Sequence, residues 1–299
     1  MSGKRVAAGA AREPFGRRPA GSLERLLADA ARRLSRARVG EPRREAVRIL
    51  ADLAGETPGG ILLRANRVAD PALRERFAEA LDRRSAGEPL PYVTGVTGFR
   101  YLTLGCDRRA LIPRPETEGV VQLLLARARS GVVADLGTGG GCLALSLRQE
   151  GNFARVLGVD CAAEALELAR ENSERLALRV TWIRGDWTSG LAHESLDAVV
   201  ANPPYVSDSE YAALDPAVRM WEPAEALRAG PDGLVAMRRV LDDGRRVLRP
   251  GGWLVMELAA SRAWAVGRLA SELGWTQVGI HEDLYGRARY LLARRRGPE

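Results

Sequence analysis

The sequence predicts an α/β protein, a parallel sheet with helices on both faces, preceded by a small helical domain. From Ser22 to about Ala86, apolar residues recur three or four positions apart, which is the period of amphipathic helices. From Gly119 to the C-terminus, short apolar strands alternate with helical stretches, and this alternation is typical of a parallel sheet. Proline and glycine are frequent between the two parts, so we expect a linker there.

The helical part contains three helical segments. The first begins near Leu23, and the second ends near Gly55. Asp70 and Pro71 open the third, because aspartate caps helices and proline suits a first turn. We therefore divide the chain into an extension at 1–20 that we expect to be disordered, a helical domain at 21–86, a hairpin or linker at 87–118 and a second domain at 119–299. Within 87–118, Tyr92-Val93 and 101–104 are expected to be short strands.

Composition excludes several classes of protein. Of the 299 residues, 46% are hydrophobic and 28% charged, which is the balance of a folded domain. No apolar run approaches the roughly 18–20 residues of a membrane span. The chain has three cysteines, no C-x-x-C pair and two histidines, so we expect no disulfide framework and no metal site. This cysteine usage fits the reducing cytoplasm.

The formal net charge is +7, and Lys4 is the only lysine, so nearly all the positive charge is arginine. The arginines are spread along the chain. This favours a compositional bias over a dedicated nucleic-acid surface, although acidic macromolecules stay open as partners.

A glycine-rich turn follows the first strand of the second domain. The apolar stretch 132–136 is followed at once by G-T-G-G-G at 137–141 and then by a helix, which lets a ligand approach backbone N–H groups. The next strand ends in Asp160, 23 residues after Gly137, where an acid can hold a ribose diol. Dinucleotides prefer G-x-G-x-x-G, but the sixth position here is Cys142. Asp135 and the glycines suit a zwitterionic methionine tail, so we favour S-adenosylmethionine over NAD.

The third strand, 180–183, leads into Gly185-Asp186-Trp187. The Asp186 carboxylate can accept a hydrogen bond from an adenine amino group, and the Trp187 indole can lie against the purine. Taken alone, these residues would be a loop acid and a half-buried tryptophan. Their place after two other matching strand ends favours the cofactor role.

The fourth strand, 197–201, ends in Asn202-Pro203-Pro204-Tyr205. The Asn202 side-chain oxygen and the Pro203 carbonyl can accept both protons of a planar –NH2 group, and Tyr205 can stack on that group. This arrangement predicts methyl transfer to an amide or exocyclic amine nitrogen. Alignment and electrostatics suffice for that reaction, and no strong general base is needed.

The chain resembles the bacterial-type peptide chain release factor glutamine N5-methyltransferases from about Leu23 to the C-terminus. The motifs that carry the resemblance are G-E-P-L at 87–90, L-I-P-R-P-E-T-E at 111–118, D-L-G-T-G at 135–139, G-D-W at 185–187, N-P-P-Y-V at 202–206, E-P-A-E-A-L at 222–227 and D-L-Y-G-R-A-R at 283–289. N-P-P-Y is shared with nucleic-acid adenine methyltransferases, whereas L-I-P-R-P-E-T-E is more specific to the glutamine enzymes.

The resemblance implies a class I methyltransferase fold, which is Rossmann-like, with a mostly parallel sheet of seven strands. It implies methyl transfer from S-adenosylmethionine to the side-chain nitrogen of the glutamine in the Gly-Gly-Gln motif of class I release factors, with S-adenosylhomocysteine as product. It also implies that the helical domain binds the release factor. The predicted cofactor-binding residues are Gly137, Thr138, Gly139, Gly140, Gly141, Asp160, Asp186, Trp187 and Asn202. The predicted substrate-binding residues are Asn202, Pro203, Pro204 and Tyr205, and the predicted catalytic residues are Asn202, Pro203 and Tyr205.

Two alternatives stay open. A nucleic-acid adenine N6-methyltransferase would explain N-P-P-Y and the positive charge, but the chain has no basic, aromatic-interleaved segment large enough to recognise a flipped base. A cofactor-binding adaptor without catalysis would not need Asn202 and Tyr205. We expect a cytoplasmic monomer whose partner is the release factor, with no membrane and no direct nucleic-acid contact required. We also expect Leu111 to Glu118 to lie beside Asn202.

Overall fold

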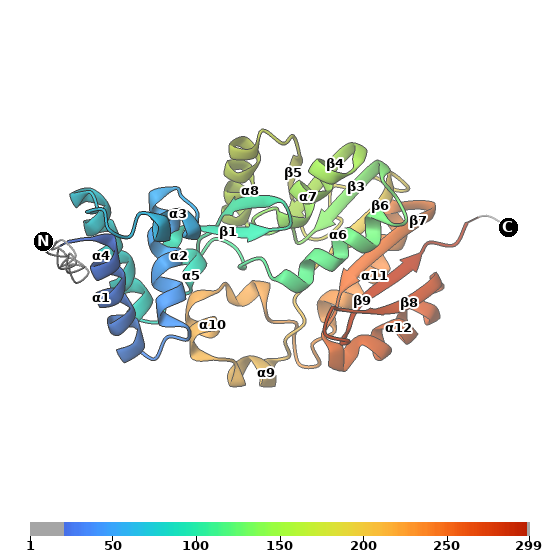
Figure 1. The fold of residues 1–299 in the computed structure, drawn as a ribbon. Coiled ribbons are helices and arrows are strands. Elements are labelled where there is room, and N and C mark those ends of the chain that lie inside the picture. The colour runs from blue at the N-terminus through green and yellow to red at the C-terminus, as the bar shows by residue number, and fades with distance from the viewer. Residues whose placement is uncertain (1–20, 298–299) are drawn as a thin grey trace, which may run out of the picture. The chain divides into compact units, whose positions relative to one another are not determined.

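The computed structural model describes residues 21–297, so the disorder expected for 1–20 lies outside the described residues. The described chain forms two compact units, residues 21–90 and residues 91–297, which are coloured from blue to red along the sequence in Figure 1. The division falls between Leu90 and Pro91. Most of the segment expected as a linker therefore belongs to the larger unit.

The smaller unit consists of four helices: α1 (Leu23–Arg36), α2 (Pro42–Ala54), α3 (Pro58–Leu63) and α4 (Pro71–Ser85). The three predicted helices are confirmed. Asp70 caps α4 by accepting the Ala72 N–H at 3.3 Å, and Gly55 ends α2 with a φ of +66°. Sequence analysis missed α3, although Thr57 caps it at 3.1 Å through the Gly60 N–H. The two glycines in this six-residue helix hid it, because glycine is a poor helix former.

The larger unit begins with α5 (Leu90–Thr94) and a hairpin of β1 (Val96–Phe99) and β2 (Leu102–Gly105). The hairpin is confirmed, but the strand expected at Tyr92-Val93 is wrong, because both residues lie in α5. Pro91 suits the first turn of a helix, and the buried Tyr92 hydroxyl donates to the Ala110 carbonyl at 2.7 Å. This tertiary contact outweighs the β propensity of tyrosine and valine.

The main sheet has seven strands in the order β5-β4-β3-β6-β7-β9-β8. Their bounds are β3 (Ser130–Leu136), β4 (Asn152–Asp160), β5 (Thr181–Arg184), β6 (Leu196–Ala201), β7 (Leu248–Glu257), β8 (Thr276–Glu282) and β9 (Ala288–Arg294). All neighbours are parallel except β9, which is antiparallel to both β7 and β8. The seven-stranded, mostly parallel sheet that the resemblance implied is confirmed.

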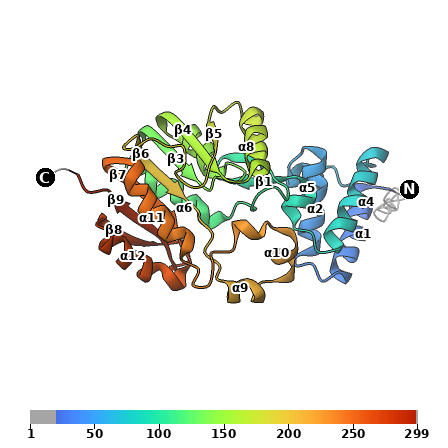
Figure 2. The ribbon, with the colours of Figure 1, turned by 180° about the vertical axis from the view of Figure 1, so that it is seen from behind.

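Helices cover both faces of this sheet, as the two opposite views show (Figure 1, Figure 2). One face is covered by α6 (Glu118–Leu125), which follows the short helix η1 (Pro115–Thr117), and by α7 (Cys142–Glu150) and α8 (Ala163–Leu176). The other face is covered by α11 (Val235–Val247) and α12 (Ala263–Glu272), the latter preceded by η3 (Ala260–Arg262). Between β6 and α11 lie α9 (Asp208–Ala213), α10 (Pro216–Trp221) and η2 (Ala224–Ala226).

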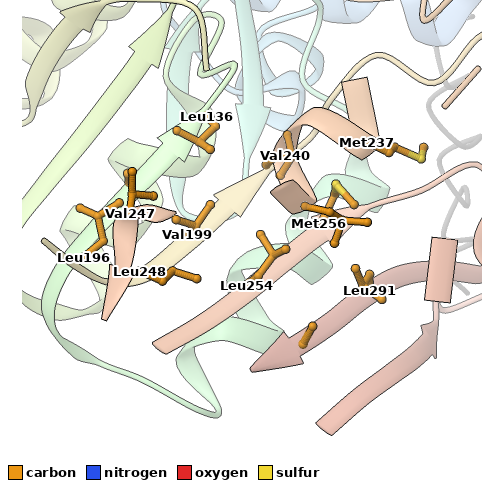
Figure 3. Close-up of a cluster of buried hydrophobic side chains, with 14 of the residues drawn as sticks. Leu136, Leu196, Val199, Met237, Val240, Val247, Leu248, Leu254, Met256 and Leu291 are labelled. Atoms are coloured by element: carbon orange, nitrogen blue, oxygen red, sulfur yellow. The ribbon is translucent and has the colours of Figure 1, made fainter. Parts of the chain in front are cut away.

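Alternation along the strands separates two hydrophobic cores. On β6, Ala198 and Val200 face α6 and α7, whereas Val199 and Ala201 face α11 and α12. Figure 3 shows the core between the sheet and helices α11 and α12. In this core, Met237 and Val240 of α11 lie among sheet residues that are 0% exposed. Because both faces of the sheet are covered, the strands are continuous apolar runs in the sequence. The packed sheet also fixes the positions of its strand ends.

The carboxyl ends of β3, β4, β5, β6 and β7 lie along one edge of the sheet, because these five strands are parallel. The strand order reverses between β3 and β6, and ligands of open α/β sheets bind at such a reversal. In residues 21–297, no helix is long and apolar enough to cross a membrane.

Candidate active site

A cavity of about 450 Å³ opens at the carboxyl ends of β3, β4 and β6. Of the predicted site residues, those that line it are Gly137, Thr138, Gly139, Gly140, Asp160, Asp186, Trp187, Asn202 and Pro204. Gly141, Pro203 and Tyr205 do not line it. Gly141 lies at the start of α7 with a φ of +88°, beside the Trp182 ring, so it shapes the loop without facing the cavity.

Asp160 ties the glycine turn to the end of β4. Its Oδ2 accepts the Gly139 N–H at 2.8 Å, and its Oδ1 accepts the Ala162 N–H at 3.0 Å. A carboxylate has about four lone-pair sites, so each oxygen of Asp160 can still accept one more hydrogen bond on the cavity side. Gly139 has a φ of +55°, a conformation that suits glycine. The geometry therefore leaves an acceptor pair available for a diol.

Asp135 lies behind the same turn and is 1% exposed. Its Oδ2 accepts hydrogen bonds from the Thr138 hydroxyl at 2.5 Å and from the Ala144 N–H at 3.2 Å. Within residues 21–297, its Oδ1 has no hydrogen-bond partner. Burial raises the pKa of this carboxyl to about 7. A buried, unpaired acceptor beside a glycine turn fits a ligand that carries an ammonium group.

Trp187 adopts an unusual backbone conformation, with a φ of +51°. A bulky residue rarely occupies this region, and such strain is common where a side chain must be aimed at a ligand. A Cβ atom added at Gly137 would lie 3.5 Å from the Trp187 ring. The ring therefore covers the glycine turn. The neighbouring Asp186 side chain is exposed at the cavity, 4.0 Å from Arg239.

The cavity thus offers an acceptor pair for a diol and an indole face, and a buried acceptor, Asp135, lies behind its glycine turn. These groups fit a nucleoside that carries a zwitterionic tail, which is the chemistry expected of S-adenosylmethionine. Within the part of the chain that the structure describes, no cluster of three His, Cys, Asp or Glu side chains could hold a metal ion.

Asn202 lies on the opposite side of the cavity, held by a side chain that sequence analysis did not single out. Its Nδ2 donates to the Thr117 hydroxyl at 3.0 Å, and that hydroxyl donates to Glu257 Oε2 at 2.6 Å. A side-chain hydroxyl, that of Thr117, therefore holds the Asn202 amide. The Tyr205 hydroxyl contacts Glu257 Oε1 at 3.4 Å, and burial raises the pKa of Tyr205 to about 12.

The segment 111–118 lies beside Asn202, as predicted from the sequence, with Leu111 to Arg114 and Thr117 all lining the cavity. Glu222, which is 5% exposed, fixes this segment from the other side. It accepts the Ile112 N–H at 3.2 Å and pairs with the Arg114 guanidinium. The next residues of E-P-A-E-A-L, Pro223, Glu225 and Ala226, also line the cavity. Two segments far apart in sequence therefore form its wall together.

Three residues that line or support this wall were not predicted as site residues: Thr117, Glu222 and Glu257. Glu257 could have been predicted from the sequence, because it is an acid at the end of a buried strand, like Asp160. No local sequence pattern indicates Thr117 or Glu222 as site residues, because their roles come from contacts with residues 85 to 110 positions away.

Two family models match the chain. Residues 25–95 match the family model described as the PrmC N-terminal domain, and residues 117–230 match the Methyltransferase small domain. The chain is 41% identical to the Release factor glutamine methyltransferase of Moorella thermoacetica, over 92% of this chain and 99% of that protein. It is 36% identical to the protein of the same name from Streptomyces coelicolor, over 91% of this chain and 98% of that protein.

Among solved structures, a methyltransferase from Pyrococcus furiosus matches 65% of this chain and 89% of its own, with 21% sequence identity and a TM-score of 0.50. This likeness agrees with the fold described above.

Proposed function

We propose that this chain, which belongs to the release factor glutamine methyltransferase family, transfers a methyl group from S-adenosylmethionine to the side-chain amide nitrogen of a glutamine in a peptide chain release factor. The observation that carries the proposal is Asn202, whose amide oxygen is left free at the cavity while its amide nitrogen is held by Thr117. Within residues 21–297, no group donates a hydrogen bond to that oxygen.

The cofactor occupies the side of the cavity formed by the glycine turn. Asp160 would accept the two ribose hydroxyls, the Trp187 indole would cover the adenine, and Asp186 would accept from the adenine amino group. The buried Asp135 carboxylate behind Thr138 would favour the ammonium of the methionine tail by its charge. The bound cofactor supplies an electrophilic methyl group on a positively charged sulfur.

The glutamine side chain would lie on the side where Asn202 and Pro204 line the cavity, with Pro203 and Tyr205 in the same turn. The Asn202 oxygen and the Pro203 carbonyl accept the two amide protons, which fixes the plane of the amide and directs the nitrogen towards the methyl group. Tyr205 supports the planar group through its π face, which also favours a nearby cation. The amide nitrogen would gain the methyl group as the methyl–sulfur bond breaks and S-adenosylhomocysteine leaves. The cationic nitrogen would then lose its proton to solvent water, so no histidine or other strong base takes part.

The finer assignments extend this proposal. The helical unit at 21–90 recognises the release factor, and the glutamine belongs to its Gly-Gly-Gln loop. The enzyme acts as a monomer on its release factor substrate. It acts in the cytoplasm, where translation ends and where its three free cysteines would stay reduced.

The test is transfer of labelled methyl from S-adenosylmethionine to four purified substrates: a class I release factor, its Gln→Ala variant at Gly-Gly-Gln, tRNA and DNA. We expect label in the intact release factor and in none of the other three. A short Gly-Gly-Gln peptide, which lacks the docking surface, should be a much poorer substrate than the whole protein. Label in nucleic acid would instead support an adenine N6-methyltransferase.

A further inference from the structure

Glu257 is a buried acid that no arginine in the described part of the chain contacts directly, although the charge of Arg289 acts on it from a distance. It ends β7, is 1% exposed, and within residues 21–297 it makes no salt bridge. The nearest arginine on β9, Arg289, instead pairs with Asp283 at 3.4 Å and donates to the Leu258 carbonyl at 3.3 Å. Burying a carboxylate without a partner charge is costly, and proteins rarely keep one where an apolar residue would pack as well. The position of Glu257 therefore needs an explanation, and its hydrogen bonds supply one.

The hydrogen bonds of Glu257 have a fixed direction. An ionised carboxylate only accepts hydrogen bonds, so the Thr117 hydroxyl must donate its single proton to Glu257 Oε2, 2.6 Å away. The Thr117 oxygen can then only accept from its other neighbour. That neighbour is the Asn202 side chain at 3.0 Å, so the nitrogen end of the amide must face Thr117.

This direction decides which atom of Asn202 faces the cavity. An amide has one donor end and one acceptor end, and the two are nearly equal in shape. With its nitrogen held by Thr117, Asn202 presents its oxygen. If Thr117 donated instead, the amide would turn over and present –NH2 to a substrate –NH2, which gives no hydrogen bond.

We propose that Glu257 is a positioning residue: acting through Thr117, it selects the orientation of the Asn202 amide that accepts a proton of the substrate glutamine. This inference rests on the proposed methylation of a glutamine amide. Glu257 contacts neither substrate nor cofactor in this scheme, because Thr117 separates it from Asn202. The same carboxylate also accepts from the Tyr205 hydroxyl at 3.4 Å, and this contact helps to fix the Tyr205 side chain.

The test compares Glu257→Gln with the parent in single-turnover methylation of a release factor. Glutamine has the same shape, but its amide can present either –NH2 or oxygen to Thr117. The variant therefore no longer enforces one direction in the relay, by which we mean the hydrogen-bonded series Glu257–Thr117–Asn202. We expect the rate of the chemical step to fall about 10²-fold, the scale of a small misalignment at a reacting centre. The affinity for S-adenosylmethionine, measured by calorimetry, should stay within about twofold, because the cofactor residues are untouched.

Two variants of Thr117 are the matched pair. Thr117→Ser keeps the hydroxyl and should retain most of the parent rate, whereas Thr117→Val keeps the shape without the hydroxyl and should fall as far as Glu257→Gln. The double variant Glu257→Gln/Thr117→Val should be no slower than Thr117→Val alone, since residues in one relay are not additive. Additive losses, or a failure of Thr117→Ser, would contradict the relay.

The pH profile provides a readout that a merely structural role would not change. Burial raises the pKa of Glu257 to about 6, while Thr117 and Arg289 oppose that rise. The other titratable groups that interact with it are Glu116, Tyr205, Tyr290 and Cys142. The chemical step of the parent should slow as the pH falls through about 6, because a protonated carboxyl can donate to Thr117.

In Glu257→Gln this low-pH step should be absent, and the rate should be low throughout. A parent that does not methylate a release factor at all would refute the proposed function. An active parent and an equally active Glu257→Gln variant would refute only the relay.

Discussion

The two sides of the cavity are built in different ways. The cofactor side comes almost wholly from one continuous stretch, 135–160, together with the loop at 185–187, and it combines a glycine turn with side chains at strand ends. The substrate side is assembled from 111–117, 202–205, 222–226 and Glu257, which meet only in the folded protein. The first can hold any ligand of similar shape, whereas the second must recognise one planar group.

This difference shows where specificity lies. The glycine turn and the strand-end acid are general features of nucleotide-like sites in parallel sheets. The substrate side depends on the direction of individual hydrogen bonds, so exchanging a few atoms there can abolish the reaction while the cofactor still binds.

The largest effect is expected at Asn202. Asn202→Ala removes the acceptor for the substrate amide, and losing one such preorganised contact slows turnover by about 10²–10³-fold, about 2.7–4 kcal/mol. Cofactor affinity should change little, because Asp160 and the glycine turn remain. Single-turnover methylation and calorimetry on the same variant separate the two effects.

Tyr205→Phe should slow turnover less than Asn202→Ala, because it keeps the stacking face and loses only the hydroxyl that contacts Glu257. If Asn202→Ala turned over within a few-fold of the parent, the two sides would not differ as described, and N-P-P-Y would be only a stiff turn.

A smaller effect, on binding rather than turnover, is expected at Asp160. Asp160→Ala removes the acceptor pair for the ribose, and each hydrogen bond to a charged group contributes about 1.5–3 kcal/mol. It also frees the Gly139 N–H from its partner. Affinity for S-adenosylmethionine should therefore fall by at least about tenfold in calorimetry. Asp186→Ala, which removes an exposed acid at the neighbouring strand end, is the control and should cost less. Equal losses would argue against the ribose assignment.

The smallest effect is expected at Asp135. The Asp135→Asn variant keeps an acceptor but loses the charge, which should weaken cofactor binding by about 1 kcal/mol, or about fivefold. The unliganded protein should gain thermal stability at pH 8. The reason is that folding raises the pKa of Asp135 from about 3.9 to about 7, so that ionisation opposes folding increasingly from pH 4 to pH 7 and fully above it.

The gain in melting temperature from Asp135→Asn should shrink at pH 5, where the folded parent already carries the proton. Scanning calorimetry at both pH values, with and without S-adenosylmethionine, measures the two effects together. A loss of stability at pH 8 would mean that the Asp135 charge supports the fold and is not held for a ligand.

The same contrast explains what could be predicted from the sequence. The glycine turn, Asp160 and Asn202 lie at strand ends that apolar runs delimit, so their meeting follows from the parallel sheet alone. Tyr92-Val93 was misassigned because a contact with Ala110 decides its structure, and α3 because its glycines mask a capped helix. The partners of Thr117 and Glu222 lie 85 to 140 residues away, and no local pattern indicates such pairs.

The separation of Thr117 and Glu257 by 140 positions also bears on how the enzyme becomes active. Contacts between residues close in sequence form early, whereas those that close long loops wait for the rest of the chain. The glycine turn can form with β3, α7 and β4, but the hydrogen bond between Thr117 and Glu257 needs β7, which is paired with β9 near the C-terminus. A chain emerging from the ribosome would thus acquire the elements of its cofactor turn before it could methylate anything, and the catalytic arrangement would be completed only once nearly the whole polypeptide had been made.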